Sequence, residues 1–538
     1  MGVGRPEGQS VSNRLKVTLF KLAPTAILIA VFLLGFLGKP EDSSWLNSSQ
    51  LWQKGDPFFW GEGSRYLSSP YFFYRGKPHA TGQWPYYGVN NRYVHNELGL
   101  RDDPIADPKP DGAFRILNIG DSATWGLSLP GRKHTYSDQL EKMLNTGAGD
   151  PERHTYDVIN AGTVGYSSWQ APRWLEFYID ELKPDVVTVF IGNNDSAPSG
   201  TSDAKRGSVP FSSVTRTLSY NAFYLLLQKA WLSLRERGRD EEREEFLTSV
   251  SSQKRSVTKE QWYDSVARVA PRDYESNLRA IIEIARKNDA RVILLKVPMN
   301  LIWPQNVIPN RRTVFNREYW YPLFVAKNYM AKGLSKRPPC DTPLLSHPWL
   351  CKLSIEQVDT HLAKQGQYRD AEHFVNEKEM LLAQPGSDLL KNSSTIYQLA
   401  MVYIAQGKYA KAEQRLRSLA DASEFDSDSA VPPQARSGIY YALGVSLLLD
   451  GRKEEARSAF VESRRIFPFA MSYEYYDAFD RIVKELKVES IDLPYLFEQN
   501  DPEYFGSSLM HDWVHPSPEG NEIIAEALAD QIARQPKR

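Results

Sequence analysis

The sequence predicts an α/β fold, a parallel sheet with helices on both faces, interrupted by an all-α insertion. Up to residue 297, short β-favouring runs alternate with amphipathic stretches. That alternation is typical of parallel strands joined by helices. More than two hundred residues then separate the fourth predicted strand from the last motif. One strand–helix unit needs far fewer, so we expect a second domain to be inserted there.

Four strands are predicted before residue 300, and three of them end at a block of small polar residues. The strands span 114–119, 156–159, 185–191 and 291–297, which are rich in β-branched and other apolar side chains. Helices are predicted at 135–144 and 278–286, then at 475–486 and 521–529, with a strand near 489–493. Carboxyl ends of parallel strands meet at one edge, where open α/β sheets bind ligands.

Four short blocks together contain the residue types of an acyl-transfer site. In chain order they are Gly120–Ser122, Asn160–Gly165, Gly192–Asp195 and Asp512–Pro516. Ser122 is the candidate nucleophile, and a serine hydroxyl needs a base within hydrogen-bond reach. His515 is the candidate base, and Asp512 is the carboxylate that would fix its tautomer.

Attack on an ester places negative charge on the carbonyl oxygen, so N–H donors must converge on that atom. We expect three donors: the backbone N–H of Ser122, the backbone N–H of Gly162 and the side-chain amide of Asn194. Gly162 has no Cβ, which lets its backbone approach a substrate closely.

Each block has an ordinary structural interpretation when taken alone. Gly-Asp-Ser is more often a turn or a helix cap, and His511 is a second imidazole beside His515. Four blocks in this order, three at predicted strand ends, favour the catalytic interpretation. The histidines form no cluster with metal-ligand spacing, so neither a metal nor another cofactor is expected.

The blocks resemble those of the SGNH hydrolases, also called the GDSL lipase/esterase family. The resemblance covers roughly residues 113–200, 270–300 and 470–535 and implies a flavodoxin-like sheet. It also implies that Ser122 is the nucleophile, that Gly162 and Asn194 are oxyanion donors, and that Asp512 and His515 are the D-x-x-H pair. Ala123 stands where many members have Leu, which is not a chemical position.

An apolar run at residues 22–38 follows several basic residues. It predicts a transmembrane anchor at the short end of spanning lengths, with residues 1–21 cytoplasmic and the remainder extracytoplasmic, at the inner membrane. A cleaved signal peptide is the alternative, although no convincing small-x-small site follows the run. In an oxidising compartment Cys340 and Cys351 would form a disulfide, and two unpaired thiols are the alternative.

The composition predicts a soluble body rather than a polytopic membrane protein, and it gives no sign of nucleic-acid binding. The chain has 538 residues and a formal net charge of −1, so it lacks the basic excess that nucleic-acid binding requires. Aromatic residues are frequent between residues 45 and 95, inside an N-terminal extension that we place at 39–112. This segment predicts a β-rich collar on the catalytic domain, with a sugar-stacking surface as the alternative.

The insertion at 355–468 contains a recurring phrase around three glycines. Gly366, Gly407 and Gly451 are 41 and 44 residues apart, and each lies where a helix–turn–helix would turn. The pattern resembles a short tetratricopeptide array, which implies a protein partner. A helical spacer is the alternative. The charged stretch at 234–255 is predicted to be a solvated helix or a lid.

Together these features predict a membrane-anchored serine esterase or O-acyltransferase whose hydrolase domain spans 113–340 and 470–538. Its resemblance to enzymes of surface polysaccharides implies an ester-bearing carbohydrate substrate, with O-acetyl groups as the target. The repeats would bind a membrane acyltransferase or a polysaccharide synthase. Two alternatives remain: a lipolytic or thioester hydrolase with the same triad, and a non-catalytic assembly factor.

Overall fold

The computed structural model describes the catalytic part of the chain and much of the insertion. The described residues are 65–69, 71–86, 89–148, 155–197, 202–207, 263–264, 267–302, 407–424, 433–466 and 472–534, with single positions at 224, 227, 396, 399–400 and 403–404. The chain divides into two compact units, residues 1–77 with 207–241 and residues 78–206 with 242–538.

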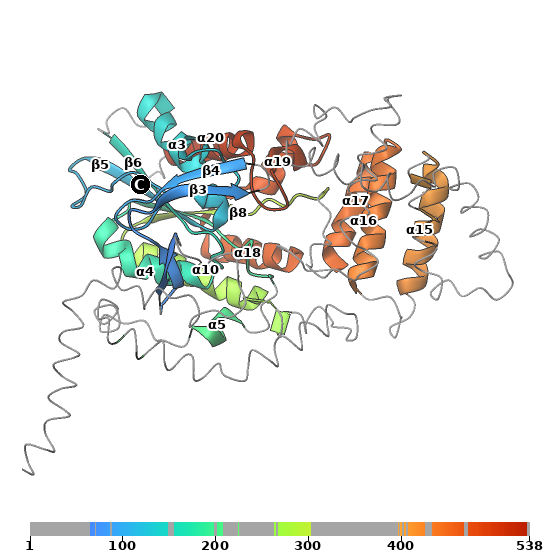
Figure 1. The fold of residues 1–538 in the computed structure, drawn as a ribbon, viewed down its shortest axis with the longest axis horizontal. Helices are drawn as coiled ribbons and strands as arrows, with labels where there is room; N and C mark the ends of the chain where they lie inside the picture. Colours follow the sequence, from blue (N-terminus) through green and yellow to red (C-terminus); the bar gives the residue numbers. More distant parts are fainter. Residues whose placement is uncertain are drawn as a thin grey trace, which may run out of the picture. The chain divides into compact units, whose positions relative to one another are not determined.

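A five-stranded parallel sheet forms the centre of the second unit (Figure 1). Its strands are β5 (Ala113–Gly120), β6 (Thr155–Gly162), β7 (Val186–Phe190), β8 (Arg291–Lys296) and β9 (Glu489–Asp492). They are arranged in the order β6-β5-β7-β8-β9, with every neighbouring pair parallel. Numbered along the chain this is 2-1-3-4-5, the flavodoxin-like order. The predicted fold class is therefore confirmed.

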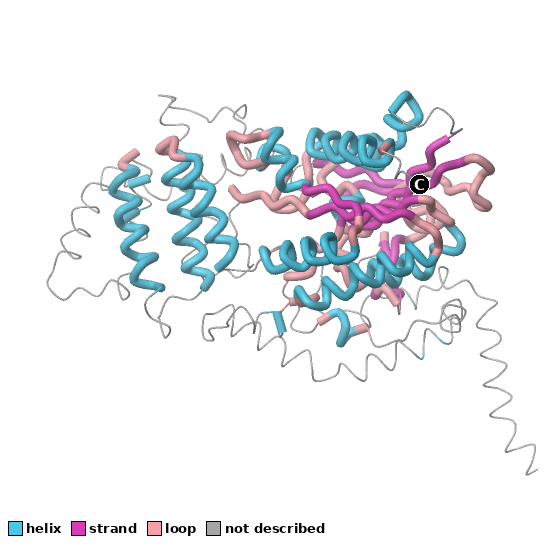
Figure 2. The backbone as a smooth tube through the Cα atoms, turned by 180° about the vertical axis from the view of Figure 1, so that it is seen from behind, coloured by secondary structure: helices cyan, strands magenta, loops and turns pink. Residues whose placement is uncertain are grey.

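Helices cover both faces of this sheet (Figures 1 and 2). On one face, α3 (Tyr136–Met143) packs against α20 (Pro518–Ala533). On the other, α10 (Pro271–Lys287) packs against both α4 (Gln170–Leu182) and α18 (Tyr473–Leu486). The last part of the chain thus completes the fold that residue 113 begins.

The burial pattern explains why these segments form these elements. All five residues of β7 are buried, as expected for a central strand with helices on both faces. Helix α10 buries Tyr274, Leu278, Ile281, Ile282 and Ala285, a single stripe at helical spacing. Each fully buried large apolar side chain contributes roughly 1.5–3 kcal/mol to the stability of the fold.

Two hairpins lie within the aromatic N-terminal extension. The first unit contains β1 (Tyr66–Ser69) paired with β2 (Phe73–Gly76), and the second contains β3 (Thr81–Tyr86) paired with β4 (Val89–Val94). Trp84 of β3 meets Trp125 edge to face with ring centroids 5.9 Å apart. The β3–β4 hairpin therefore packs on the catalytic domain, as expected for a collar.

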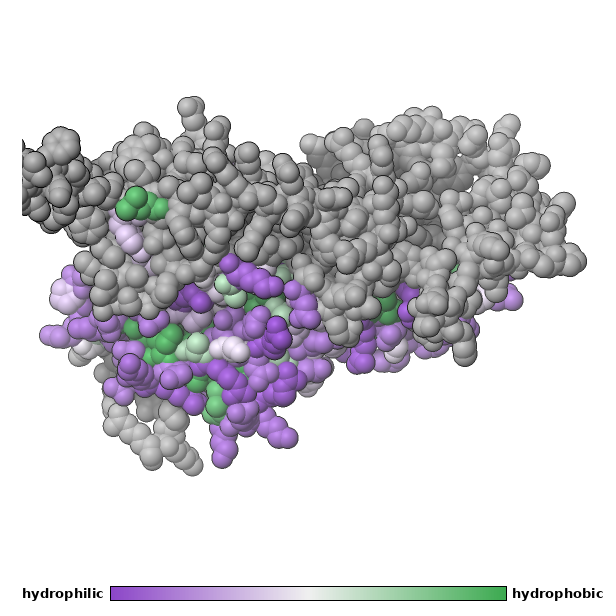
Figure 3. Space-filling view, turned by 90° about the horizontal axis from the view of Figure 1, so that it is seen from below, coloured by the Kyte–Doolittle hydropathy of each residue, from purple (hydrophilic) through white to green (hydrophobic). Residues whose placement is uncertain are grey.

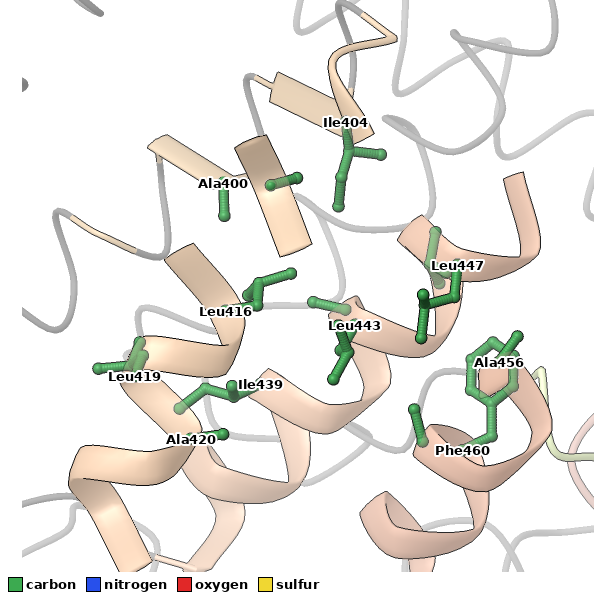
Figure 4. Close-up of a cluster of buried hydrophobic side chains, with 14 of the residues drawn as sticks. Ala400, Ile404, Leu416, Leu419, Ala420, Ile439, Leu443, Leu447, Ala456 and Phe460 are labelled. Carbon is green, nitrogen blue, oxygen red and sulfur yellow. The ribbon is translucent and has the colours of Figure 1, made fainter. Parts of the chain in front are cut away.

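The described part of the insertion is helical. It contains α15 (Tyr409–Glu424), α16 (Pro433–Leu449) and α17 (Lys453–Ile466), which share a hydrophobic core (Figure 4). A Cβ on Gly444 would lie 2.7 Å from the ring of Phe460, so glycine is required where α16 approaches α17. Helix α17 also contacts the segment that precedes the Asp512–Pro516 block, because Phe460 packs on Phe505.

Two of the three recurring phrases form the same kind of turn. Gly407 and Gly451 have φ of 75° and 83°, a conformation that favours glycine. At the second turn, the N–H groups of Gly451 and Arg452 donate to the carbonyls of Leu448 and Leu447. The same hydrogen-bond pattern recurs at Gly407 and is typical of a helix C-terminus. The phrase at 363–372 lies outside the described residues, and the tetratricopeptide assignment stays a prediction.

Several other predictions also fall outside the described residues. They are the anchor at 22–38, the lid at 234–255 and the pair Cys340 and Cys351. Among the residues that are described, none of the helices combines the length and apolar character needed to span a bilayer. On the face shown in Figure 3, the described surface is mostly hydrophilic, with smaller hydrophobic patches.

Candidate active site

Ser122 lies where β5 turns into the four-residue helix α2 (Ser122–Trp125). Asp121 caps this helix, because its Oδ1 accepts the N–H of Ala123 at 2.9 Å. The serine is 5% exposed, so its hydroxyl lies in a site from which most water is excluded. Low water access strengthens every electrostatic interaction made with that hydroxyl.

His515 joins Ser122 to Asp512. Its Nε2 lies 2.7 Å from Ser122 Oγ, and its Nδ1 lies 2.7 Å from Asp512 Oδ2. The carboxylate can only accept at neutral pH, so Nδ1 carries the proton and Nε2 is left to accept the serine proton. The structure thus brings together the three predicted catalytic residues, and His515 rather than His511 is the imidazole that contacts Ser122.

Asp512 is held as an anion although it is fully buried. Burial acts to raise its pKa, but the charge and hydrogen bond of His515 and the N–H of Val514 outweigh burial and lower that pKa to about 2. Its Oδ1 accepts the backbone N–H groups of Val514 and His515, both at 2.9 Å. The carboxylate therefore remains charged at neutral pH, and its two backbone hydrogen bonds fix its orientation.

Gly162 does not fit the role that we predicted for it. Its N–H donates to Asn160 Oδ1 at 3.0 Å, so it is already used within the chain. A Cβ at Gly162 would lie 2.2 Å from the backbone nitrogen of Trp125. Gly162 is thus a packing glycine that lets β6 approach the helix carrying Ser122, and its assignment as an oxyanion donor is corrected.

Gly165 is better placed to donate. The loop that carries it starts beside the nucleophile, because Thr163 N–H donates to Gly120 O at 3.1 Å. It continues to Asn194, whose Nδ2 donates to Tyr166 O at 2.9 Å. Within the part of the chain that the structure describes, neither the N–H of Gly165 nor that of Ser122 donates to another group.

The wrong assignment of Gly162 follows from the predicted end of the second strand. We expected the second strand to end at residue 159, but β6 continues to Gly162. That extension places Gly162 inside the strand and leaves Gly165, with φ of 80°, as the glycine in the loop. The signal was present in the sequence as the second glycine of the block, three residues beyond the first.

A buried polar network holds this loop in place. Arg268 Nη1 donates to Gly165 O at 2.7 Å, and its guanidinium also pairs with Asp203 at 2.8 Å. Asp195 accepts the N–H of Ser168 at 2.8 Å as well as its hydroxyl. Burial raises the pKa of Asp195 to about 7. The network fixes the candidate donor loop by contacts to residues far away in sequence.

Tyr86 is a residue of the site that no sequence pattern selected. Its hydroxyl donates to Asp512 Oδ2 at 3.1 Å, and its ring meets the His515 imidazole edge to face at 5.4 Å. The tyrosine therefore contacts both members of the Asp–His pair from the β3–β4 hairpin. It is separated from Asp512 by 426 positions, and no local pattern connects the two.

We expect Tyr86→Phe to lower kcat about tenfold with little change in KM, because it removes one hydrogen bond to a charged, buried carboxylate. The ring stays against His515, so the fold is retained. Steady-state kinetics on an aryl ester measure the effect. Tyr86→Leu, which also removes the ring, is expected to cost more. Wild-type kcat in Tyr86→Phe would show that the hydroxyl plays no part.

Asp512 is supported from its other side by the insertion. Asn300 Nδ2 donates to the carbonyl of Asp512 at 2.9 Å. Arg464, a buried residue of α17, donates to the carbonyl of Asn300. Tyr441 of α16 also donates to Ile302 O at 2.7 Å. Two insertion helices therefore hold the segment that braces Asp512.

Comparisons with known proteins give one family match and several similar solved structures. Residues 119–321 match the GDSL-like Lipase/Acylhydrolase family. No curated protein matches the chain. The chain is similar to the structure of TesA, with 20% identity, a TM-score of 0.20 and coverage of 36% of this chain and 64% of TesA.

Two further structures are similar at low identity. One is the psychrotrophic esterase EstA from Pseudoalteromonas sp., with 12% identity, a TM-score of 0.19 and coverage of 47% of this chain and 73% of that one. The other is a catalytic mutant of an acetylxylan esterase from Geobacillus stearothermophilus, with 13% identity, a TM-score of 0.27 and coverage of 78% and 95%. Within residues 119–321, the chain contains a domain of the GDSL-like lipase/acylhydrolase family.

Proposed function

We propose that the chain is a serine esterase or O-acyltransferase that forms an acyl-enzyme at Ser122. The observation that carries this proposal is the position of His515, with Nε2 2.7 Å from Ser122 Oγ and Nδ1 2.7 Å from Asp512 Oδ2. An imidazole held between a serine and a buried carboxylate is the arrangement that activates a serine for acyl transfer.

In the first half of the cycle, Ser122 Oγ attacks the ester carbonyl carbon while His515 Nε2 takes the hydroxyl proton. The carbonyl electrons move onto oxygen, and the N–H groups of Ser122, Gly165 and Asn194 stabilise that charge. The oxyanion then re-forms the carbonyl and expels the alcohol oxygen, which takes the proton from His515. Ser122 is left as an acyl ester.

In the second half, His515 removes a proton from the acceptor while the acceptor oxygen attacks the acyl carbon. Ser122 Oγ leaves and recovers its proton from His515. Water as the acceptor releases a carboxylic acid and makes the protein an esterase. A sugar hydroxyl as the acceptor forms a new ester and makes it an O-acyltransferase.

The substrate we favour is an O-acetyl group on a cell-surface polysaccharide. The apolar run at 22–38 with its basic flank supports a membrane anchor and an extracytoplasmic catalytic domain. A polysaccharide outside the cytoplasm is a substrate that such a domain can reach. We further propose that the insertion recruits a protein partner, a membrane acyltransferase or a polysaccharide synthase.

Covalent labelling tests the proposed nucleophile directly. A fluorophosphonate loses fluoride when an activated serine attacks its phosphorus, so the full-length protein is expected to gain one adduct at Ser122. Peptide mass spectrometry locates the adduct. His515→Ala removes the base and should abolish labelling. A folded wild-type sample that stays unlabelled would contradict the proposal and favour a non-catalytic role.

A further inference from the structure

A cavity of about 240 Å³ lies at the carboxyl ends of β8 and β9. It is bounded by Lys296 and Asp492, the last residues of these two strands, and by residues of α17, α18 and α19 (Leu493–Asn500). The strands β8 and β9 are separated from β5, which carries Ser122, by β7. The cavity therefore shares the ligand-binding edge of the sheet with Ser122 but lies at different strands.

The charged groups of this cavity balance one another. Lys296 Nζ pairs with Asp492 at 3.0 Å and with Asp480 at 2.7 Å. Arg457 of α17 pairs with Glu498 of α19 through two hydrogen bonds of 2.7 and 2.9 Å. Each lining cation thus has a carboxylate partner within contact distance. A charged ligand would therefore add a charge that no lining group is left to balance, so the lining favours a neutral ligand.

These paired groups still have hydrogen-bonding capacity for such a ligand. An ammonium has three donors and a guanidinium has five, while each carboxylate oxygen has two lone pairs. The cavity wall therefore contains both donors and acceptors, on Lys296, Asp492, Arg457 and Glu498. A hydroxyl group both donates and accepts, so a polyhydroxylated molecule matches this lining.

Tyrosines supply part of the apolar lining. Tyr473 and Tyr476 meet edge to face at 5.7 Å, and both line the cavity with Tyr495. Tyr495 is 63% exposed, and among the described residues only Val94 and Leu227 are also exposed large hydrophobic side chains. An exposed aromatic ring beside paired charges offers a flat surface to the C–H face of a sugar ring.

We propose that this cavity binds a neutral sugar unit, as a subsite distinct from Ser122. Its volume is below the roughly 300 to 1,000 Å³ of sites for drug-sized ligands, which limits the occupant to about one ring. The inference extends the proposed function, because a subsite on the same edge would hold a polymer while an ester on it reaches Ser122. Helix α17 would then contribute to sugar binding, since Arg457 forms part of the cavity wall.

Binding to the full-length protein tests this proposal, in a Ser122→Ala background and a detergent without a sugar headgroup. The probes are glucose, galactose, mannose and N-acetylglucosamine, with glucuronate as the charged comparison, and saturation-transfer NMR reports contact. We expect at least one neutral sugar to bind and glucuronate to bind more weakly. Tyr495→Ala is expected to weaken binding about tenfold, whereas Tyr495→Phe keeps the ring and the binding.

Val94→Ala is the matched control, because Val94 is also 63% exposed and lies on the β3–β4 hairpin instead of the cavity. It should bind like the parent. Binding by none of the four neutral sugars would overturn the proposal, as would equal binding by Tyr495→Ala or stronger binding of glucuronate. Since Ser122 is absent throughout, failure here is separate from failure to label Ser122.

Discussion

A Ser122→Ala variant is expected to lose ester hydrolysis by a factor of about 10⁴ to 10⁶ in kcat/KM while keeping its fold. The change removes the hydroxyl that His515 Nε2 is placed to deprotonate, at 2.7 Å, and active-site serines of this arrangement typically contribute that much. Hydrolysis of p-nitrophenyl acetate measures the rate, and circular dichroism through thermal unfolding checks the fold. Undiminished activity would sink the proposed mechanism.

Ser128→Ala is a matched control for this variant. Ser128 is buried like Ser122 and lies six positions further along the chain, but its Oγ has no hydrogen-bond partner among the described residues. The same chemical change therefore removes no described contact there. Full activity is expected in Ser128→Ala, so a loss shared by both variants would point to damage of the local backbone instead of loss of the nucleophile.

An Asp512→Asn variant is expected to lower kcat about 10⁴-fold. The Oδ1 of Asp512 accepts two backbone N–H groups, so the amide oxygen of an asparagine must take that position. Its NH2 group would then face His515 Nδ1 and force the proton onto Nε2. His515 in that tautomer donates to Ser122 Oγ and cannot accept its proton. A kcat within tenfold of wild type would contradict this orientation of the ring.

The pH dependence follows from the same residue. The pKa of Asp512 is lowered to about 2 from an ordinary 3.8, so its ionised form stabilises the fold above that ordinary value. This contribution is lost as the pH falls from about 3.8 towards 2. Between pH 5 and 8 the group stays ionised. We therefore expect the wild-type rate profile to show no acid limb that belongs to Asp512.

The sheet and the triad were predictable because their signals are local. Val186–Phe190 reads as a buried strand from its own side chains, and Ser122, Asp512 and His515 each lie in a short recognisable block. Gly165 was missed because a strand boundary three residues out changes which glycine lies in the loop. Tyr86 and Asn300 were beyond reach, since they meet Asp512 across 426 and 212 positions, a pairing that only the folded chain creates.

The contact of Arg464 with Asn300, and of Asn300 with Asp512, has a consequence for dissecting the protein. Excising residues 355–468 would remove Arg464 together with any partner-binding surface, and Asn300, which contacts Asp512, would lose its hydrogen bond from α17. A truncated chain would therefore lose catalysis and recruitment at once. Point changes on the outer face of α15, which leave these contacts intact, are the cleaner way to separate the two. The insertion therefore supports the catalytic site of the hydrolase, although it interrupts the hydrolase sequence.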